Sequence, residues 1–416
     1  MSKLALNGGS PIRSRAFPAW PVFDEAEEQA LLEVLRSGKW WLYTMGESVT
    51  PDSAGAANSA VVRFQHAFAQ AQDSRFGIAC STGTAALEVA LKALGVGPGH
   101  DVVVPPYTFV ATASAPMLIG ARSVFCDIEA DTWNLDPKRL EEAITPQTRA
   151  IVPVHFAGLA ADMASILEIA NRRGIPVLED AAHGHGGTWN GRGLGSIGAA
   201  GAFSFQASKN MTAGEGGLIT TNDPAIAELC DSYIWCGRQF GRPWYEHHRL
   251  GWNYRLTEFQ AAILSTQLAR LEQQGDRRIA NGLYLNRELA QIPGLRPLRI
   301  PPYATRHAFH IYALRFDEAG FGIDRATFLA AMAAEGIPCS SGYGSPLYRN
   351  PMFAGMDYPD NCPVAERVCR EALWFEHRLL LGTQADMDDI VRAASRIYEC
   401  RQELTSVGVT SEGASQ

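Results

Sequence analysis

Short apolar runs alternate with stretches of helical spacing through the middle of the chain. The apolar, β-branched runs predict strands over 101–105, 123–127, 150–155, 176–179, 202–205 and 218–221. Between the earlier runs, apolar positions recurring every three or four residues predict helices over 84–94, 109–119, 137–144 and 162–173. This alternation is typical of an α/β fold with a largely parallel sheet covered by helices on both faces. Ligands of such sheets bind beyond the carboxyl ends of the strands, which is where we look for chemistry.

The domain organisation follows from where this pattern begins and ends. Residues 1–24 are expected to form an N-terminal arm, and residues 25–292 a large α/β domain that includes a long helix over 257–289. Prolines then cluster, so the composition changes and residues 293–404 are expected to form a smaller α+β domain. Residues 405–416 are small and polar and predict a flexible tail. The remaining predicted elements are helices over 24–35, 325–335, 364–374 and 386–398, a strand over 310–316 and a loop over 51–58.

Composition and charge exclude several classes of protein. Hydrophobic residues make up 46% of the chain and charged residues 19%, a balance that a disordered chain does not have. The net charge of −8 disfavours binding to nucleic acid or to an anionic membrane through a broad positive field. No run approaches the roughly 20 apolar residues of a membrane helix, and the first 17 residues lack the apolar region of a secretory signal. We therefore expect a cytoplasmic protein.

The pattern of the eight cysteines also favours a cytoplasmic location. They are scattered, they form no C-x-x-C pair, and no histidine cluster has metal-ligand spacing. Most of them fall in apolar segments, so we interpret them as buried free thiols in a reducing compartment. No metal site is expected.

The lysines can be considered one by one, because only five of the 36 cationic residues are lysines. Four of them are expected at the surface: Lys3, Lys39, Lys92 and Lys138. Lys209 differs, because it follows an apolar strand and precedes a run of small residues that lets a ligand approach the backbone. A desolvated lysine has a lowered pKa and can act as a Schiff-base nucleophile. A loop lysine beside a glycine turn is the alternative, and the pattern leaves both open.

A second candidate is the carboxylate that ends the apolar run over 175–180. Asp180 could cap the next turn, which is the commoner role, or pair with a cationic ring nitrogen of a ligand. A pyridoxal phosphate site needs a lysine for the aldehyde and an acid for the pyridine nitrogen. The 29 residues from Asp180 to Lys209 fit two adjacent strand ends.

Hydroxyls and aromatic rings could supply the other parts of such a site. Gly83 and Thr84 begin a predicted helix after Ser-Thr, and hydroxyls with N–H groups at a helix N-terminus suit a phosphate. An ordinary N-cap is the commoner explanation of this motif. Ser204 is a second hydroxyl near the lysine. Tyr107 or Phe109 could stack on a flat ring or simply pack on the core.

In this order, the motifs resemble those of the DegT/StrS-type family of pyridoxal-phosphate sugar aminotransferases. The matching segments are S-T-G-T-A-A-L (81–87), P-P-Y-T-F-V-A-T (105–112), P-V-H-F-A-G (153–158), E-D-A-A-H (179–183), S-F-Q-A-S-K-N-M-T-A-G-E-G-G (204–217) and G-W-N-Y-R-L-T-E-F-Q-A-A (251–262). Several linked motifs at consistent spacing are far more specific than any one of them. The resemblance implies a fold type I enzyme with a large, mostly parallel sheet domain, a smaller C-terminal α+β domain and bound pyridoxal 5'-phosphate.

The resemblance also implies a role for each candidate residue. The positions that match cofactor contacts are Lys209 (Schiff base), Asp180 (pyridine nitrogen), Gly83, Thr84 and Ser204 (phosphate), Phe109 (ring stacking) and His183 (lying against the cofactor). Asn253 matches an asparagine that reaches the phosphate of the neighbouring subunit, which implies a homodimer with shared active sites. On its pattern alone, Asn253 is a turn residue before a helix.

One departure from the family pattern bears on the substrate. Many sugar aminotransferases of the family have histidine after the S-F of the lysine motif, whereas this chain has Gln206. This form is similar to the branch that acts on cyclitols and to 3-amino-5-hydroxybenzoate synthase. The resemblance implies transfer of an amino group from Gln or Glu to a ketone on a cyclitol, keto-sugar or related carbocycle, in antibiotic or amino-sugar biosynthesis. By location, the candidate substrate contacts are Tyr107, His185, Gln206 and Tyr343.

Two other hypotheses keep the fold but change the function. A pyridoxal-phosphate lyase or dehydratase is one, although the sugar-dehydratase relatives carry histidine where this chain has Lys209. A sugar-responsive regulator without turnover is the other. No helix-turn-helix or basic segment supports it, and a catalytically dead relative is not expected to keep both Lys209 and Asp180.

Overall fold

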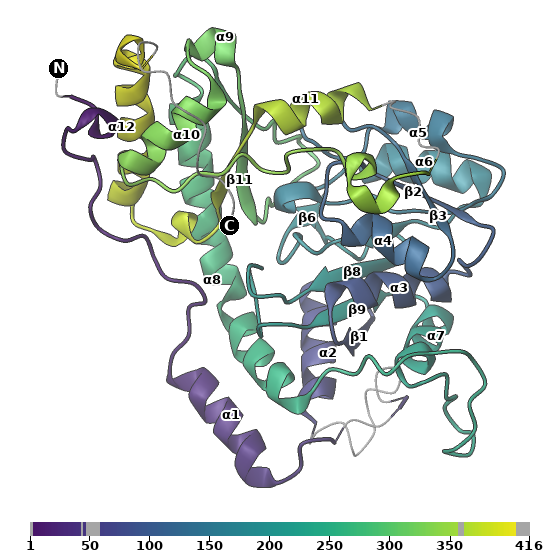
Figure 1. Ribbon diagram of the computed structural model, residues 1–416. Helices are drawn as coiled ribbons and strands as arrows, with labels where there is room; N and C mark the ends of the chain where they lie inside the picture. Colours follow the sequence, from purple (N-terminus) through teal and green to yellow (C-terminus); the bar gives the residue numbers. More distant parts are fainter. Residues whose placement is uncertain (1–2, 43–44, 47–58, 357–361, 405–416) are drawn as a thin grey trace.

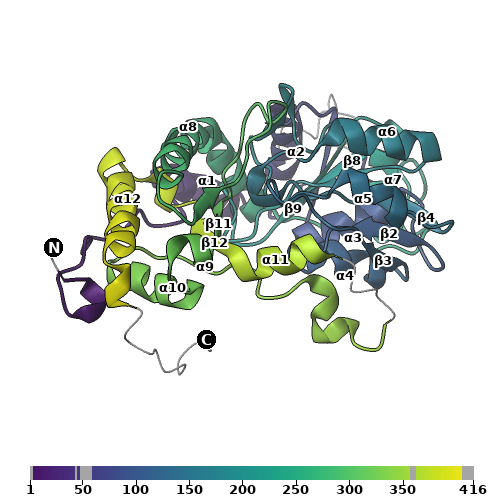
Figure 2. The ribbon, with the colours of Figure 1, turned by 90° about the horizontal axis from the view of Figure 1, so that it is seen from above.

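The structure is a computed structural model, and it describes residues 3–42, 45–46, 59–356 and 362–404. A sheet covered by helices forms the larger part of the molecule. A second, smaller sheet lies near the C-terminal end of the long helix α8, Glu258–Leu289 (Figures 1 and 2). The loop expected over 51–58 and the tail expected over 405–416 lie outside the described residues. No helix in the described ranges combines the length and apolar character that crossing a membrane requires.

The strands of the large sheet are those that the apolar runs predict, with one addition at the edge. They are β1 (Phe76–Cys80), β2 (Asp101–Val104), β3 (Arg122–Phe125), β4 (Thr148–Ile151), β5 (Leu178–Asp180), β8 (Ala200–Ser204) and β9 (Gly217–Thr221). Pairing runs β1-β9-β8-β5 and β4-β2-β3, and parallel bridges from Ile151 to Val177 and from Val154 to Asp180 join the two groups. Only β9 runs antiparallel to its neighbours within this sheet as described. The prediction of a largely parallel sheet is therefore confirmed.

Helices cover both faces of this sheet because its strands are apolar on both sides. Val102 and Val104 of β2 pack in one hydrophobic cluster with residues of α3 and α4, whereas Val103 packs in another with residues of α5 and α6. The helices of this part are α1 (Glu25–Ser37), α2 (Ala60–Ala71), α3 (Gly83–Ala93), α4 (Ala111–Leu118), α5 (Pro137–Ala143), α6 (Met163–Arg173) and α7 (Pro224–Ile234). The sequence prediction missed α2, α7 and β1, as well as the short hairpin of β6 (Thr188–Trp189) and β7 (Arg192–Gly193).

The smaller part is built on an antiparallel sheet in the order β10-β11-β12. Its elements are β10 (Leu295–Pro297), β11 (Ile311–Phe316), α9 (Glu318–Phe321), α10 (Arg325–Ala334), α11 (Pro363–Glu371), β12 (Ala372–Glu376) and α12 (Gln384–Glu399). The helix predicted over 364–374 is wrong at its end, because α11 stops at Glu371. Leu373 and Phe375 are buried on one face of β12 while the strand pairs with β11, and this alternation has the period of a strand.

The N-terminal arm belongs to the core of the smaller part. Leu4 and Phe17 join the hydrophobic cluster that contains Leu285 of α8 and residues of α10, α12 and β11. The Arg13 guanidinium is buried and pairs with the carboxylates of Asp386 and Asp389 at 2.7 and 2.9 Å. The arm thus crosses over to residues more than 350 positions away, and the domain boundaries drawn from the sequence stay a prediction.

Candidate active site

A cavity of about 600 Å³ lies where β5 and β8 end side by side. Asp180 is the last residue of β5, Ser204 is the last residue of β8, and Lys209 follows five positions later. The predicted site residues that line the cavity are Gly83, Thr84, Phe109, Asp180, His183, Ser204, Gln206, Lys209 and Tyr343. Segments more than 250 residues apart in the sequence therefore meet at the strand ends, as the α/β rule predicts.

The Asp180 carboxylate is held in a fixed orientation at the base of this cavity. Its Oδ2 accepts a hydrogen bond of 2.7 Å from the hydroxyl of Thr112 on α4, and its Oδ1 accepts one of 3.2 Å from the amide of Ala182. Burial nevertheless raises the pKa of Asp180 above its usual 3.8, because these bonds and the charge of Lys209 only partly replace water. A cationic group in the cavity would stabilise this carboxylate.

Lys209 lies on a short loop that is held by hydrogen bonds within the loop and by two contacts from outside. Its amide donates to the carbonyl of Gln206 at 2.9 Å, and the Gln206 side-chain oxygen accepts from the amide and hydroxyl of Ser208. From outside the loop, the Trp20 indole donates to the Ala207 carbonyl at 2.8 Å, and His377 Nε2 donates to the Ser208 carbonyl at 3.0 Å. The loop is thus held by the N-terminal arm and by the smaller part of the molecule.

The amine of Lys209 is easier to deprotonate than an ordinary lysine. Burial lowers its pKa from the usual 10.5 to about 8, and the charge of Asp180 opposes part of that shift. Roughly a tenth to a fifth of such an amine is neutral near physiological pH, far more than of an ordinary lysine, and the neutral form can act as a nucleophile and as a proton acceptor.

One wall of the cavity is built as a cradle for an anion. Thr82 caps α3 by accepting a hydrogen bond of 3.0 Å from the amide of Ala85. The amides of Gly83 and Thr84 make no hydrogen bond within the described ranges, and they open into the cavity with the hydroxyls of Thr84 and Ser204. A Cβ on Gly83 would lie 2.5 Å from the Cβ of Ser204, so only glycine allows α3 and the end of β8 to come this close.

Two histidine rings face each other on the far wall. His183 is 4% exposed, and its Nδ1 accepts a hydrogen bond of 3.3 Å from the amide of Ala157. The ring of His310 lies 4.2 Å from that of His183, centroid to centroid, with a tilt of 32°. Burial holds the pKa of both rings well below the usual 6.5, so both are neutral at physiological pH.

Sequence reasoning missed several residues that line the cavity. His310 and Trp374 come from the smaller part, and Thr112 comes from α4. His310 stands only three positions after His307, but nothing in the pattern separates a cavity histidine from a packed one. The helix predicted over 364–374 includes Trp374, whereas in the structure Trp374 lies on strand β12. The helical prediction hides the alternation of more and less buried residues that marks this strand.

Three predicted residues are not brought to this cavity. Tyr107 is 1% exposed and lies behind Tyr343, with ring centroids 5.4 Å apart, so Tyr343 stands between it and the cavity. His185 is enclosed by aromatic rings, among them Phe203 and Phe205 at 5.6 and 5.5 Å. Tyr107 and His185 therefore do not line the cavity where their location in the sequence had suggested substrate contacts, and a role in substrate binding stays a prediction. Asn253 is exposed and lines a separate hollow, together with Trp40 and Trp41.

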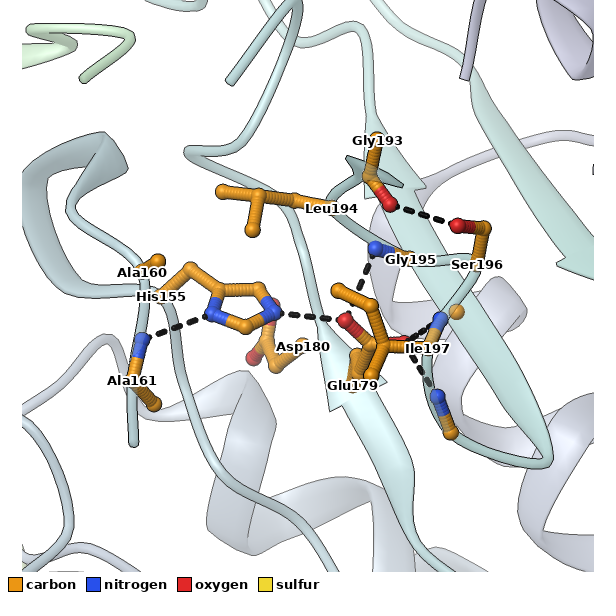
Figure 3. Close-up of polar contacts among 12 residues, drawn as sticks. His155, Ala160, Ala161, Glu179, Asp180, Gly193, Leu194, Gly195, Ser196 and Ile197 are labelled. Carbon is orange, nitrogen blue, oxygen red and sulfur yellow. Dashed lines mark hydrogen bonds and ion pairs between the residues drawn. The ribbon is translucent and has the colours of Figure 1, made fainter. Parts of the chain in front are cut away.

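A saturated polar network lies directly behind the carboxylate of Asp180. Glu179 and His155 are both fully enclosed, and His155 Nε2 donates to Glu179 Oε2 at 2.8 Å. The Glu179 carboxylate also accepts from the amides of Gly195, Ile197 and Gly198 at 2.9, 2.7 and 2.6 Å (Figure 3). The Asp180 side chain takes part in none of these contacts. Glu179 thus fastens the loop that leads into β8.

Comparison with known proteins gives one consistent result. The profile of the DegT/DnrJ/EryC1/StrS aminotransferase family matches residues 23–395. The chain is 36% identical to the L-glutamine:2-deoxy-scyllo-inosose aminotransferase of Micromonospora echinospora, over 97% of this chain and 100% of that one. It is 35% identical to the 3-amino-5-hydroxybenzoate synthase of Amycolatopsis mediterranei, over 89% of this chain and 94% of that one.

Solved structures agree with the sequence relatives. A crystal structure of 3-amino-5-hydroxybenzoic acid synthase matches with a TM-score of 0.81 and 34% identity, covering 92% of this chain and 100% of that one. An aminotransferase from Psychrobacter cryohalolentis matches with a TM-score of 0.83 and 30% identity, covering 92% and 99%. The resemblance carried by the motifs and the fold that it implied are both confirmed.

Proposed function

Because the chain belongs to the DegT/DnrJ/EryC1/StrS aminotransferase family, and is a pyridoxal-phosphate-dependent aminotransferase of fold type I, we propose that it transfers the amino group of glutamine to a ketone on a cyclitol ring. The observation that carries this proposal is that Lys209, Asp180 and the anion cradle of α3 share one cavity. The substrate class rests on the relatives named for L-glutamine and 2-deoxy-scyllo-inosose, and on Gln206 in the lysine motif. We place the reaction in antibiotic or amino-sugar biosynthesis.

The residues present fit pyridoxal phosphate at both of its charged ends. The free amides of Gly83 and Thr84, with the hydroxyls of Thr84 and Ser204, suit a phosphate dianion at the positive end of a helix. At the other end, the hydrogen bonds that the buried Asp180 carboxylate makes with described residues come from the Thr112 hydroxyl and the Ala182 amide, both neutral, so the carboxylate would bond to a protonated ring nitrogen. Phe109, 56% exposed, and His183 line the cavity where a flat ring would lie between them.

Each residue then has a defined task in the proposed reaction. Bound pyridoxal phosphate supplies an electron-withdrawing ring that stabilises negative charge on the carbon bearing the amino group. Lys209 Nζ would hold the cofactor, and as a free amine it would take the proton from the α-carbon of the donor. Asp180 keeps the ring nitrogen protonated through its fixed carboxylate. In the second half-reaction, Lys209 would return a proton to the carbon of the cyclitol that receives the amino group.

We further propose a homodimer in which Asn253 of one subunit reaches the phosphate site of the other. What supports this is that Asn253 is exposed and lies beside Trp40 and Trp41, each 56% exposed, in a hollow away from its own cavity. A cytoplasmic location is also proposed, supported by buried free thiols such as those of Cys80, Cys126 and Cys230. Sedimentation velocity and mixing of Asn253→Ala with Lys209→Ala subunits would test the shared site, because one intact site per mixed dimer restores activity.

The function is tested by following the two half-reactions separately through cofactor absorbance. With glutamine or glutamate alone, wild-type enzyme should convert its cofactor to the amine form and release the keto acid; a keto-cyclitol should then reverse the change. Lys209→Ala should lose at least about 10³-fold in rate, since it removes both the attachment point and the proton carrier. Lys138→Ala, an exposed lysine on α5, is the matched control and should match wild type. Turnover by Lys209→Ala at the wild-type rate would end the proposal.

A further inference from the structure

His310 brings the smaller part of the molecule into contact with the cavity. It directly precedes β11 and lines the cavity, and it lies against His183, which follows β5 of the large sheet. His310 is 6% exposed. Its Nε2 makes no hydrogen bond with any described residue and is not among the fully enclosed polar atoms, so this nitrogen opens to the cavity.

The hydrogen-bond network assigns the tautomer of His310. The Asn210 side-chain amide donates through Nδ2 to the Ala308 carbonyl at 2.8 Å, which turns its Oδ1 toward His310 Nδ1 at 3.3 Å. A carbonyl oxygen only accepts, so Nδ1 of His310 must carry the hydrogen. In a neutral imidazole the other nitrogen is then a bare acceptor. His310 therefore presents an unoccupied lone pair at Nε2 to the cavity.

His183 presents the opposite polarity. Its Nδ1 accepts from the Ala157 amide, so in the neutral ring the hydrogen lies on Nε2. The two facing rings thus offer one N–H donor and one bare acceptor to whatever enters the cavity. An acceptor without a partner in such an enclosed place costs free energy, and a ligand that brings a donor to that point removes the cost. The site is therefore selective for ligands that carry such a donor.

We propose that Nε2 of His310 accepts a hydrogen bond from a ring hydroxyl of the acceptor substrate and so selects polyhydroxylated rings. This inference rests on the proposed function and adds to it a residue that recognises the acceptor. A cyclitol carries hydroxyl donors around its ring, whereas a carboxylate or ketone oxygen offers a bare nitrogen nothing. Because Asn210 neighbours Lys209 in the chain, the same contact also ties the recognition of the ring to the loop that carries the reactive amine.

Two substitutions separate the acceptor atom from the rest of the ring. His310→Asn retains an amide N–H close to the position of Nδ1, so the bond to Asn210 can persist, but it has no atom at the position of Nε2. His310→Gln places an amide group near Nε2 and can supply an acceptor oxygen there. His307→Asn is the matched control, because His307 is also buried, stacks on Phe309 at 3.8 Å between ring centroids, and does not line the cavity.

The test measures both half-reactions of each holoenzyme, with glutamine as donor and 2-deoxy-scyllo-inosose as the acceptor probe. We expect His310→Asn to lower kcat/KM of the acceptor half-reaction by about 10- to 100-fold. The donor half-reaction and the cofactor content should stay within about twofold of wild type, and His310→Gln should recover most of the loss. Acceptor analogues that each lack a different ring hydroxyl complete a cycle of enzyme variants and substrate analogues. The analogue without the contacted hydroxyl should have a low kcat/KM with wild type, and His310→Asn should lower that value no further.

The outcomes distinguish this inference from the function on which it rests. If wild type completes the donor half-reaction but aminates no cyclitol ketone, the proposed function fails and the inference fails with it. If wild type aminates the ring and His310→Asn does so equally well, only the inference is overturned. Equal losses in both half-reactions, or a loss confined to glutamine, would also overturn it, because His310 would then act on the donor or on the fold.

Discussion

Glu179 and Asp180 are neighbouring carboxylates at the end of the same strand, yet the structure uses them in opposite ways. Glu179 is enclosed, accepts four hydrogen bonds and does not line the active-site cavity. Asp180 accepts two, lines the cavity, and has a pKa raised by burial. Successive residues of a strand point to opposite faces, so one carboxylate faces the loop before β8 and the other faces the ligand space. A saturated carboxylate stabilises the fold, whereas an incompletely satisfied one at a cavity is available for chemistry.

The largest effect that sharpens this comparison is expected from Asp180→Asn. The variant keeps the shape but cannot hold a protonated ring nitrogen, so kcat/KM should fall by about 10² to 10³-fold. The cofactor-free protein should be no less stable than wild type, since a partly desolvated carboxylate is removed. Steady-state kinetics measures the fall in kcat/KM, and thermal unfolding measures the stability of the cofactor-free protein. A stable enzyme with near-normal kcat/KM would refute the role given to Asp180.

The converse is expected for Glu179→Gln. Glutamine offers one acceptor oxygen and an NH₂ group to four donors, so buried N–H groups lose their partner and the free energy of unfolding should fall by about 3 kcal/mol. The molecules that remain folded should keep kcat within a fewfold of wild type. Urea unfolding and active-site titration measure these quantities, and Glu142→Gln, an exposed carboxylate on α5, is the control. If kcat dropped as far as in Asp180→Asn while stability held, the distinction between the two carboxylates would be wrong.

A smaller effect concerns pH. Only neutral Lys209 can attach to an aldehyde, and its pKa is about 8, so the rate of cofactor uptake by cofactor-free protein should rise with pH with a midpoint near 8. The negative charge of Asp180 raises the pKa of Lys209, so Asp180→Asn should move that midpoint to lower pH. Stopped-flow absorbance across pH 6 to about 10.5 gives both values. A midpoint close to the usual 10.5 would show that Lys209 is not desolvated.

The smallest effect is expected from the hydroxyl that orients Asp180. Thr112→Val removes the bond of 2.7 Å to Oδ2, which should raise the pKa of Asp180 further and lower kcat/KM by about 3- to 10-fold. Thr145→Val is a matched control, because Thr145 donates to Asp101 at 2.6 Å at the other end of the sheet. The control should lose stability without losing kcat/KM. Equal kinetics for the two variants would mean that the Thr112 bond does not matter for catalysis.

The sequence predicted the parts of the site that local pattern controls. Lys209 and Asp180 each follow an apolar strand, and parallel strands place such residues at one edge of the sheet. Local pattern alone could not separate Glu179 from Asp180, since both carboxylates end the same run, and only the motif resemblance selected Asp180. Nor could the pattern place His185, which has the same type and neighbourhood as His183. Those distinctions depend on which face of a strand or turn is covered by α2, by α4 or by the smaller part.

The chain's own alternation of apolar runs and helical spacing therefore determined the α/β fold, the parallel sheet and the edge at which a ligand binds. Tertiary structure alone decided that His310 and Trp374 reach the cavity, that Tyr343 covers Tyr107, and that the arm packs into the smaller part. The physical reason is one of range. Periodicity reports the environment of a residue's own strand or helix, whereas the walls of a cavity are set by packing between segments that lie hundreds of residues apart.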